Sequence, residues 1–475
     1  MSEERWPLPQ NWRWTEAGEI ADVVGGGTPS AKDPDNFAET GIPWLTPADL
    51  TGYSRVYIER GARDLSEKGY KTSSATLMPK GAILYSSRAP IGYCAIAANP
   101  ISTNQGFKSL VPASEVSPEF VRLYLLASKE YAESKSSGTT FKELSGSRMA
   151  KLAVPLPPLP EQRRIVAKLD RLSTRSRAAR DHLARTATLA ARAKQAILVA
   201  AFRGDLTAEW RERTNPPAIS ADPTKIDNRA RLIDALPPAW GWAALTSLAE
   251  VAGGLTKNQK RAAMPMQMPY LRVANVYANE LRLSEVLDIG CTATEADKAR
   301  LQNGDLLVVE GNGSRDQIGR VAIWRAEIDE CLHQNHLIRV RPSPEVLPEF
   351  ALYWLLSPPG RNAIEAVASS SSGLHTLSIT KVKGLPVPAC ALDEQREIVR
   401  RIETAFARID RLTAEAARAA QLLNRLDERL LAKAFRGELV PQDPADEPAE
   451  ALLARIRAAR AAAPRPKRGR RRKTA

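Results

Sequence analysis

Three short segments contain residue types that could do chemistry on a nucleic acid or a nucleotide. The Asn-Pro-Pro-Ala segment at 215–218 is similar to the tetrapeptide with which amino-methyltransferases act on a flipped base, but that tetrapeptide normally ends in an aromatic residue, and Ala218 cannot stack. Asp393-Glu394 would need a G-x-x-x-x-G-K-S/T phosphate loop to serve as a helicase box, and the sequence has none. Gly311-Asn312-Gly313 lacks the third glycine of a dinucleotide fingerprint. None of these segments predicts a catalytic site.

Histidines and cysteines show no ligand spacing typical of a metal site. His333 and His336 have no carboxylate companion in a helical H-E-x-x-H context, so a core or loop role is expected. The four cysteines lie far apart and form no C-x-x-C pair: Cys94, Cys291, Cys331 and Cys390. We expect buried free thiols rather than disulfides or a zinc site.

Composition indicates an ordinary soluble protein of two or three domains in 475 residues, with 43% hydrophobic and 26% charged residues. No run of eighteen apolar residues occurs and the start has no signal pattern, so a cytoplasmic location is expected. The net charge is +14, but residues 455–475 hold ten Lys and Arg and no acid, which leaves +4 for the rest. Net charge alone therefore does not identify a DNA-binding body. The tail is either a basic arm that touches phosphates or a solubilising terminus.

The sequence contains an internal repeat. The block LPEQRRIV at 159–166 recurs as LDEQREIV at 392–399, and AFRGDL at 201–206 recurs as AFRGEL at 434–439, both with an offset of 233. The preceding blocks repeat more loosely, with offsets between 226 and 235, and each copy contains a glycine-rich loop. A shared scaffold with divergent loops is expected of two modules that read different ligands.

The segments 161–204 and 394–437 are predicted to form a coiled coil. Apolar or small residues recur at alternating steps of four and three in both, over roughly 60 Å each at about 1.5 Å per residue. Antiparallel pairing matches small residues with large ones, for example Thr186 with Leu412, and also faces Leu172 with Leu426. Two separate helices, each packed on its own domain, are the alternative. The first segment has eleven Lys and Arg against three acids, which suits phosphates, an acidic partner or simply solvent.

With the repeat in view, the chain resembles the specificity subunit of Type I restriction–modification systems. The resemblance covers nearly the whole chain and rests on PLPPLPEQRRIVAKLD and VPACALDEQREIV, which open the helices, and on AFRGDLTAEWRE and AFRGELVPQDP, which close them. The phrases GIPWLTPADL, GAILYSSRAPIG, NQGFKSLVP, VVEGNGSRDQIGR and HQNHLIRVRP support it. Cys390 and Ala391 depart from the proline run of the first copy, which puts only the detail of that junction in doubt.

The resemblance implies an α/β (α+β) fold class, with two globular target-recognition domains joined by two long antiparallel coiled-coil helices in a pseudo-twofold repeat. It implies assembly with two modification (methyltransferase) subunits and two restriction (motor-nuclease) subunits. S-adenosylmethionine, ATP and magnesium are expected on those partners and no cofactor on this chain. The expected segments are a first recognition domain (1–158), first spacer helix (159–204), linker (205–235), second recognition domain (236–391), second spacer helix (392–437) and C-terminal segment with basic tail (438–475).

Each recognition domain is expected to read half of a bipartite, asymmetric target in double-stranded DNA with loop side chains. In the first domain the candidates are Thr28, Ser30, Lys32, Ser87 and Arg88. In the second they are Lys257, Asn258, Lys260, Arg261, Asn312, Ser314, Arg315 and Gln317, with Arg315 and Gln317 preferred. Asn, Gln and Arg suit paired contacts to base edges and Lys suits phosphates, although each residue also fits a solvated or turn-stabilising loop position.

Two functions of other classes remain as alternatives. The chain could be a self-contained DNA-modifying enzyme with an unrecognised site, or a structural coiled-coil adaptor that leaves DNA unread. Neither alternative explains a duplicated scaffold with divergent loops as simply.

Overall fold

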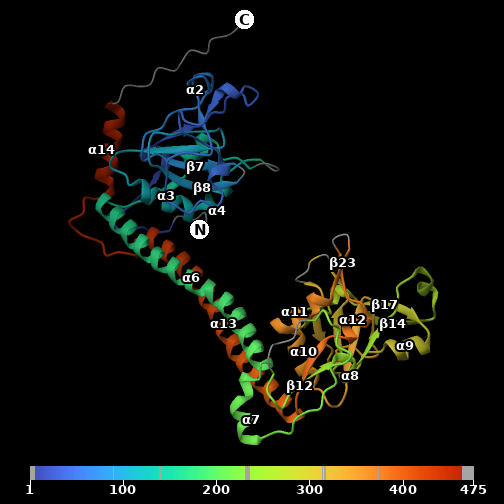
Figure 1. Cartoon of the computed structure of the whole chain (residues 1–475). Coiled ribbons are helices and arrows are strands. Elements are labelled where there is room, and N and C mark those ends of the chain that lie inside the picture. The colour runs from blue at the N-terminus through green and yellow to red at the C-terminus, as the bar shows by residue number, and fades with distance from the viewer. Residues whose placement is uncertain are drawn as a thin grey trace. The chain divides into compact units, whose positions relative to one another are not determined.

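The computed structural model describes residues 6–88, 90–138, 142–230, 236–312, 314, 317–371 and 374–462. The chain divides into two compact units (Figure 1). The first unit comprises residues 1–182 and 419–475, and the second comprises residues 183–418. Among the described residues, no helix is long and apolar enough to cross a membrane.

The first unit is built on a five-stranded sheet with strand order β2-β10-β7-β8-β5. The strands are β2 (Ala21–Gly25), β10 (Lys108–Pro112), β7 (Ile83–Ser87), β8 (Ile91–Ala97) and β5 (Tyr57–Ile58). Alternate residues of β7 enter different apolar clusters, because successive side chains of a strand point to opposite faces: Ile83 and Tyr85 join one cluster and Leu84 the other. Helices α3 (Pro118–Ala127) and α4 (Lys129–Ser134) pack on β8. The sheet is therefore buried on both faces.

The second unit repeats this framework. Its sheet has the order β13-β22-β18-β20. The strands are β13 (Ala249–Gly253), β22 (Leu337–Pro342), β18 (Leu306–Val309) and β20 (Val321–Ile323). Helix α10 (Pro348–Leu356) covers β20 as α3 covers β8. The second unit also has a sheet of β17 (Leu287–Cys291), β14 (Met266–Leu271) and β21 (Leu332–His333). The sequence repeat is therefore a repeat of structure.

In each unit, the first and last strands of the repeat pair antiparallel immediately before a long helix. Strand β1 (Arg13–Glu16) pairs with β11 (Ala153–Leu156), and β12 (Gly241–Ala244) pairs with β25 (Pro386–Ala389). This pairing brings the start of each domain to the point where the helix leaves it.

The two long helices are α6 (Leu159–Phe202) and α13 (Leu392–Phe435), each of 44 residues. In the first unit, Ile165 of α6 shares a core with Phe435 of α13, and in the second unit Phe202 of α6 shares a core with Ile398 of α13. The start of one helix thus lies beside the end of the other in both units, which confirms antiparallel pairing (Figure 1). Gly204, with φ +80°, and Gly437, with φ +75°, follow the helix ends in the left-handed region.

The predicted seam is confirmed in α6, where every predicted position from Ile165 to Ala200 is buried or half-buried. In α13 most of the predicted positions are also buried or half-buried, and the exceptions are Leu412, Leu426 and Lys433, which closes the run. Leu412 and Leu426 are 58% and 47% exposed, whereas their neighbours Thr413 and Asp427 are half-buried. The predicted layers that face Thr186 with Leu412 and Leu172 with Leu426 therefore do not form as predicted. The spacing favoured the two apolar leucines, but the helix turns their polar neighbours Thr413 and Asp427 towards the seam.

The C-terminal segment contains a helix that the sequence analysis did not predict. Helix α14 (Ala449–Ala462) buries Leu452, Leu453 and Ile456 in the core of the first domain. Arg457 lies 2.7 Å from Glu19, and the amide of Ala449 donates to the carbonyl of Asn11 at 2.9 Å. The first domain is therefore completed by residues from the far end of the chain.

Candidate nucleic-acid interface

Each glycine-rich loop follows the first strand of its sheet and rests on the backbone of a later turn. In the first domain the amide of Gly27 donates to the carbonyl of Thr103 at 2.8 Å, and a Cβ on Gly26 would lie 1.9 Å from the carbonyl oxygen of Asn104. In the second domain the amide of Leu255 donates to the carbonyl of His333 at 2.9 Å, and a Cβ on Gly254 would lie 2.0 Å from that oxygen. Only glycine fits at these two positions, because the backbone of the loop lies so close to the backbone of the turn that a Cβ would collide with it.

In the first domain, the structure brings the two predicted segments to one turn, residues 104–106. Thr28, Ser30 and Lys32 are exposed, and the hydroxyl of Thr28 is hydrogen-bonded to Gln105 of that turn. Ser87 is buried and its hydroxyl donates to the carbonyl of Gly106 at 3.1 Å. Ser87 is therefore a side chain that holds the turn, and we leave it out of the interface.

Arg88 lies at the edge of the same surface and is half-exposed. Its guanidinium is 4.0 Å from the carboxylate of Glu143, which also lies 3.4 Å from the ammonium of Lys108. Glu143 is thus shared between two cations, and the Arg88 guanidinium is the more distant of the two.

In the second domain, Lys257, Asn258 and Lys260 are exposed, but Arg261 is only 9% exposed. The Arg261 guanidinium donates to the carbonyls of Thr256 and Gly290 at 2.7 and 2.8 Å and pairs with Glu295. Through this pair, Arg261 lowers the pKa of Glu295 to about 2. Arg261 therefore organises the loop, and we leave it out of the interface as well.

The other predicted segment of the second domain lies only partly within the described residues. Arg315, one of the two preferred candidates, lies outside them. The backbone of Asn312, in β19 (Gly311–Asn312), pairs with His375 of β24 (Leu374–Thr376). Ser314 is exposed, and its carbonyl accepts from the amide of Gln317 at 3.1 Å.

Sequence reasoning missed the turns on which the glycine loops rest. Gln105 is exposed, and at the matching place in the second domain Gln334 and Asn335 are half-buried and His336 is exposed. His336 Nδ1 lies 2.7 Å from the carboxylate of Glu310, at the end of β18. The signal was present, because NQGF and HQNH stand at equivalent places in the repeat, but it was used only for the family resemblance.

Several titratable groups of the described residues are buried in the domain cores. His333 is fully buried, its Nδ1 lies 2.8 Å from the carbonyl of Ala299, and burial lowers its pKa to about 4. Burial raises the pKa of the Cys94 and Cys331 thiols to about 12. Among the described residues, no group of His, Cys, Asp or Glu is arranged to hold a metal ion.

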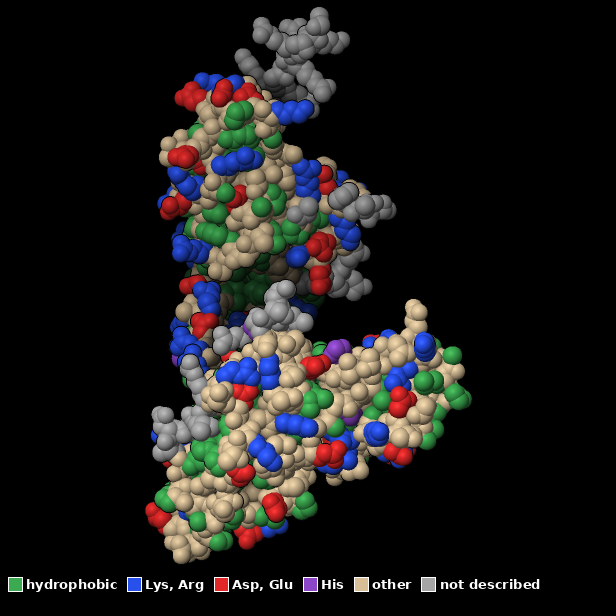
Figure 2. All heavy atoms as spheres, turned by 45° about the vertical axis from the view of Figure 1, so that its right-hand side comes forward, with side chains coloured by type: hydrophobic (Ala, Val, Ile, Leu, Met, Phe, Trp, Pro, Cys, Tyr) green, Lys and Arg blue, Asp and Glu red, His purple; other side chains and the backbone are tan. Residues whose placement is uncertain are grey.

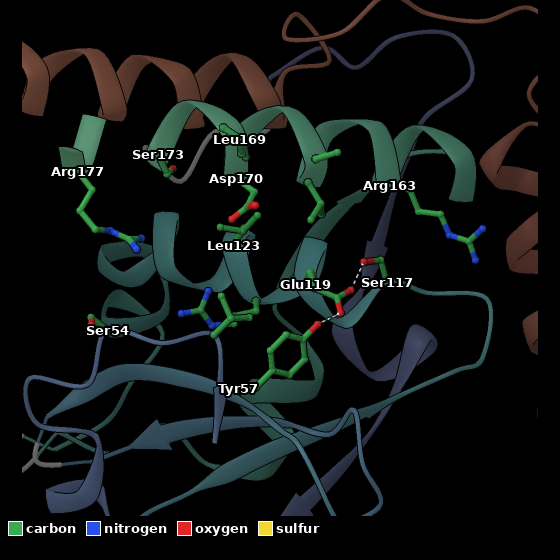
Figure 3. Close-up of a pocket in the computed structure, with 14 residues that line it drawn as sticks. Ser54, Tyr57, Ser117, Glu119, Leu123, Arg163, Leu169, Asp170, Ser173 and Arg177 are labelled. Carbon is green, nitrogen blue, oxygen red and sulfur yellow. Dashed lines mark hydrogen bonds between the residues drawn. The ribbon is translucent and has the colours of Figure 1, made fainter. Parts of the chain in front are cut away.

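A pocket of about 470 Å³ in the first unit lies between the domain and the start of α6 (Figure 3). Tyr57 and Ser117 both donate to the carboxylate of Glu119, at 2.5 and 2.7 Å. Burial raises the pKa of Tyr57 to about 12. The matching space in the second unit is filled by Tyr353 and Phe406, whose ring centres are 5.9 Å apart.

On the side shown in Figure 2, Lys and Arg side chains are interspersed with acidic ones over both units. On that side, therefore, charge alone does not mark a surface for nucleic acid.

Comparison with known proteins identifies the repeat. The pattern described as the Type I restriction modification DNA specificity domain matches residues 9–181 and 237–420. The StySPI specificity subunit of Salmonella potsdam is 27% identical over 96% of this chain and 97% of its own length. The EcoBI specificity subunit of Escherichia coli is 30% identical over 69% of this chain and 68% of its own.

The MjaIX specificity subunit of Methanocaldococcus jannaschii is 43% identical over 34% of this chain, which spans 38% of that relative. Among solved structures, the HsdS subunit from Thermoanaerobacter tengcongensis superposes with a TM-score of 0.60 at 20% identity, over 92% of this chain and 100% of that one. This likeness shows a shared fold.

Proposed function

The chain belongs to the family of Type I restriction–modification specificity subunits, and we propose that each of its two domains reads one half of an asymmetric, interrupted DNA target. The observation that carries the proposal is that both domains fold the same elements around different side chains. In each, a glycine loop, a polar turn and the end of a central strand converge. The two domains thus carry different side chains on the same scaffold.

The side chains proposed to read bases belong to the glycine loops, the polar turns and the segments that follow the central strands, and Arg315 among them lies outside the described residues. They are Thr28, Ser30, Arg88 and Gln105 in the first domain, and Asn258, Asn312, Ser314, Arg315, Gln317, Gln334 and Asn335 in the second. Side-chain amides pair with adenine and guanidinium groups with guanine through two hydrogen bonds in the major groove. Lys32, Lys257 and Lys260 are proposed to contact phosphates, which position the domain without reading sequence.

The paired helices are proposed to set the number of unread base pairs between the two half-sites. A fixed distance between two reading modules translates into a fixed spacing along the duplex. The antiparallel contacts found in both units support this role, because each domain core contains the start of one helix and the end of the other.

We propose that the chain contributes no catalytic group and directs partner subunits to the target. The family resemblance supports a complex with two modification subunits and two motor-nuclease subunits in the cytoplasm. S-adenosylmethionine, ATP and magnesium would be bound by those partners.

The test is to map methylated bases across the genome in cells with and without this chain. The expected result is one interrupted asymmetric motif that loses its methylation only when the chain is missing. Purified chain that methylates or cuts DNA by itself would establish the alternative of a self-contained enzyme. Unchanged methylation in its absence would favour a structural adaptor.

A further inference from the structure

The two long helices carry opposite charges at positions that the repeat makes equivalent. The offset of 233 relates Lys194 of α6 to Asp427 of α13. In the second unit, the Lys194 ammonium lies 2.6 Å from the Asp410 carboxylate. In the first unit, Asp427 pairs with Arg180 and accepts from the Ser176 hydroxyl at 2.8 Å. In both units, therefore, α6 supplies the cation across the seam and α13 supplies the carboxylate.

The apolar contacts at the ends of the two helices are alike. Phe202 ends α6 and Phe435 ends α13 at equivalent positions of the repeat. Each ring meets a phenylalanine of its domain edge-on, Phe350 at 5.3 Å and Phe120 at 5.6 Å. The helix ends therefore do not distinguish α6 from α13, whereas the charges of the seam between them do.

The repeat gives the geometry of the wrong pairs. Two α6 helices paired in the same register would place Arg180 opposite Lys194 and Lys194 opposite Arg177. Two α13 helices would place Asp427 opposite Asp410. By symmetry each of these contacts occurs twice. Like charges that face each other across a seam select against that pairing.

Three of the four seam charges lie where solvent screens them incompletely, and the fourth, Asp410, is 62% exposed. The side chains of Arg180 and Asp427 are 35% and 28% exposed, and Lys194 is 30% exposed and lies 5.0 Å above the Phe406 ring. The two helices also differ in overall charge: α6 has ten Lys and Arg against three acids, and α13 has nine Lys and Arg against eight acids. A pair of α6 helices is thus opposed both locally and overall.

We infer that the seam of α6 selects a helix of the α13 type and rejects a second α6, so that two first halves do not pair. This selection depends on the fold and not on which bases are read. Its consequence is that two unlike domains always meet, even when halves of different chains can exchange.

The test uses the full chain with a protease site inserted between Pro217 and Ala218, two exposed linker residues. The cleaved chain is dissociated in denaturant and renatured, and native mass spectrometry reports which fragments pair. Wild type is expected to give only fragment 1–217 with fragment 218–475. A statistical mixture that contains pairs of fragment 1–217 would overturn the inference.

Reversing one seam charge should change the choice of partner. Lys194→Asp gives attractive contacts between two copies of α6 and faces Asp410 with a like charge, so pairs of fragment 1–217 should rise about tenfold or more. Arg185→Asp, an equal charge change on an exposed position of the same helix, is the matched control and should keep wild-type pairing. Equal behaviour of the two variants contradicts the inference.

A second measurement does not depend on renaturation. In the uncleaved chain, Lys194→Asp and Asp410→Lys should each lower the urea midpoint, and the double variant should recover most of the loss. Purely additive effects would show that Lys194 and Asp410 do not recognise each other, and the inference would fail.

Discussion

At the scale of single residues, the two domains differ most plainly at one buried position. His333 of the second domain stands where the first domain has Thr103, directly before the polar turn in both. The glycine loop rests on the backbone carbonyl of both residues. Of these two side chains only the histidine can take up a proton, burial lowers its pKa to about 4, and its Nε2 has no hydrogen-bond partner among the described residues. The stability of the second unit is therefore expected to depend on pH through this position, and that of the first unit is not.

Acid should destabilise the second unit through His333. Because the folded pKa of about 4 lies below the ordinary 6.5, the unfolded chain binds a proton that the folded chain does not. The contribution of His333 is complete above pH 6.5 and falls as the pH drops towards 4, by up to roughly 3 kcal/mol. Urea unfolding at pH 7, 5 and 4 checks this. His333→Thr should flatten the pH dependence, and an unchanged slope would contradict it.

Replacing Gln105 by Ala should weaken specific binding by roughly 10- to 100-fold, because a paired amide contact to a base contributes about 1–3 kcal/mol. The loss should relax sequence preference in one half of the target only. Competition binding with targets changed in either half measures this. Gln10→Ala, an exposed glutamine of the same domain, is the control and should leave affinity unchanged. Equal losses with both variants would exclude a direct role for Gln105.

The sequence predicts which loops come together better than it predicts which of their side chains are exposed. The glycine loops could be predicted because a cluster of glycines indicates a close approach of two backbones. In both domains the glycine loop does lie against the backbone of a polar turn. Ser87 and Arg261 were predicted to contact DNA because of their hydrogen-bonding groups. In the structure, both side chains donate to backbone carbonyls of the protein itself. A single sequence does not show whether a hydroxyl or guanidinium faces inward, because that depends on which distant backbone groups need donors.

At the scale of elements, the Glu-Gln pair that opens each long helix fixes the helix to its domain. Glu161 accepts from the indole of Trp12 at 2.9 Å, and Glu394 accepts from the indole of Trp240 at 2.9 Å. In the second unit, Arg211 also pairs with Glu394 at 2.5 Å. The repeated motif is thus a junction that sets how each helix leaves its domain.

Glu394→Ala should destabilise the second unit by roughly 3–5 kcal/mol, because it leaves the partly buried Arg211 and the buried indole of Trp240 without an acceptor. Glu161→Ala should cost less, about 1–3 kcal/mol, because its hydrogen-bond donors are the neutral side chains of Trp12 and Gln442 and no Arg among the described residues forms an ion pair with it. Urea unfolding compares the two. The exposed neighbour Asp393→Ala is the control with a small expected change, and equal losses at Glu161 and Glu394 would argue against the role of Arg211.

The helices themselves were predicted within two residues at each end, because the four-three spacing and the terminal glycines are local signals. The inward face of α13 was predicted only in part. Asp427 lies in the seam because Arg180 and Ser176 of the other helix meet it there. That partner lies hundreds of residues away in sequence, so helical periodicity alone favoured the neighbouring leucine.

Inserting one heptad into both helices at matching layers should lengthen the unread gap of the target by about three base pairs, since seven residues add about 10.5 Å. An insertion into α6 alone should shift Lys194 away from Asp410 and abolish activity or change the gap. Methylation mapping of both variants distinguishes these outcomes. A gap that stays constant in the doubly extended chain would contradict the spacer role.

At the scale of the whole molecule, the two readers are independent modules on a common frame. Replacing residues 8–155 with the corresponding domain of another family member should change one half of the methylated motif and leave the other half and the gap as they are. The graft must keep the Trp12 and Phe120 contacts to Glu161 and Phe435. A change in both halves would contradict modular reading.

The docking of α14 and Phe435 on the first domain has a consequence for biosynthesis. The ribosome makes Phe120, Tyr124 and α1 (Ala17–Ile20) early, but the residues that cover them emerge only after the whole second unit. The nascent first domain must wait with an open apolar face while everything else is translated. Chaperone dependence should therefore fall on this half of the chain, and a premature stop before residue 435 should yield a product that is degraded rather than a shortened reader.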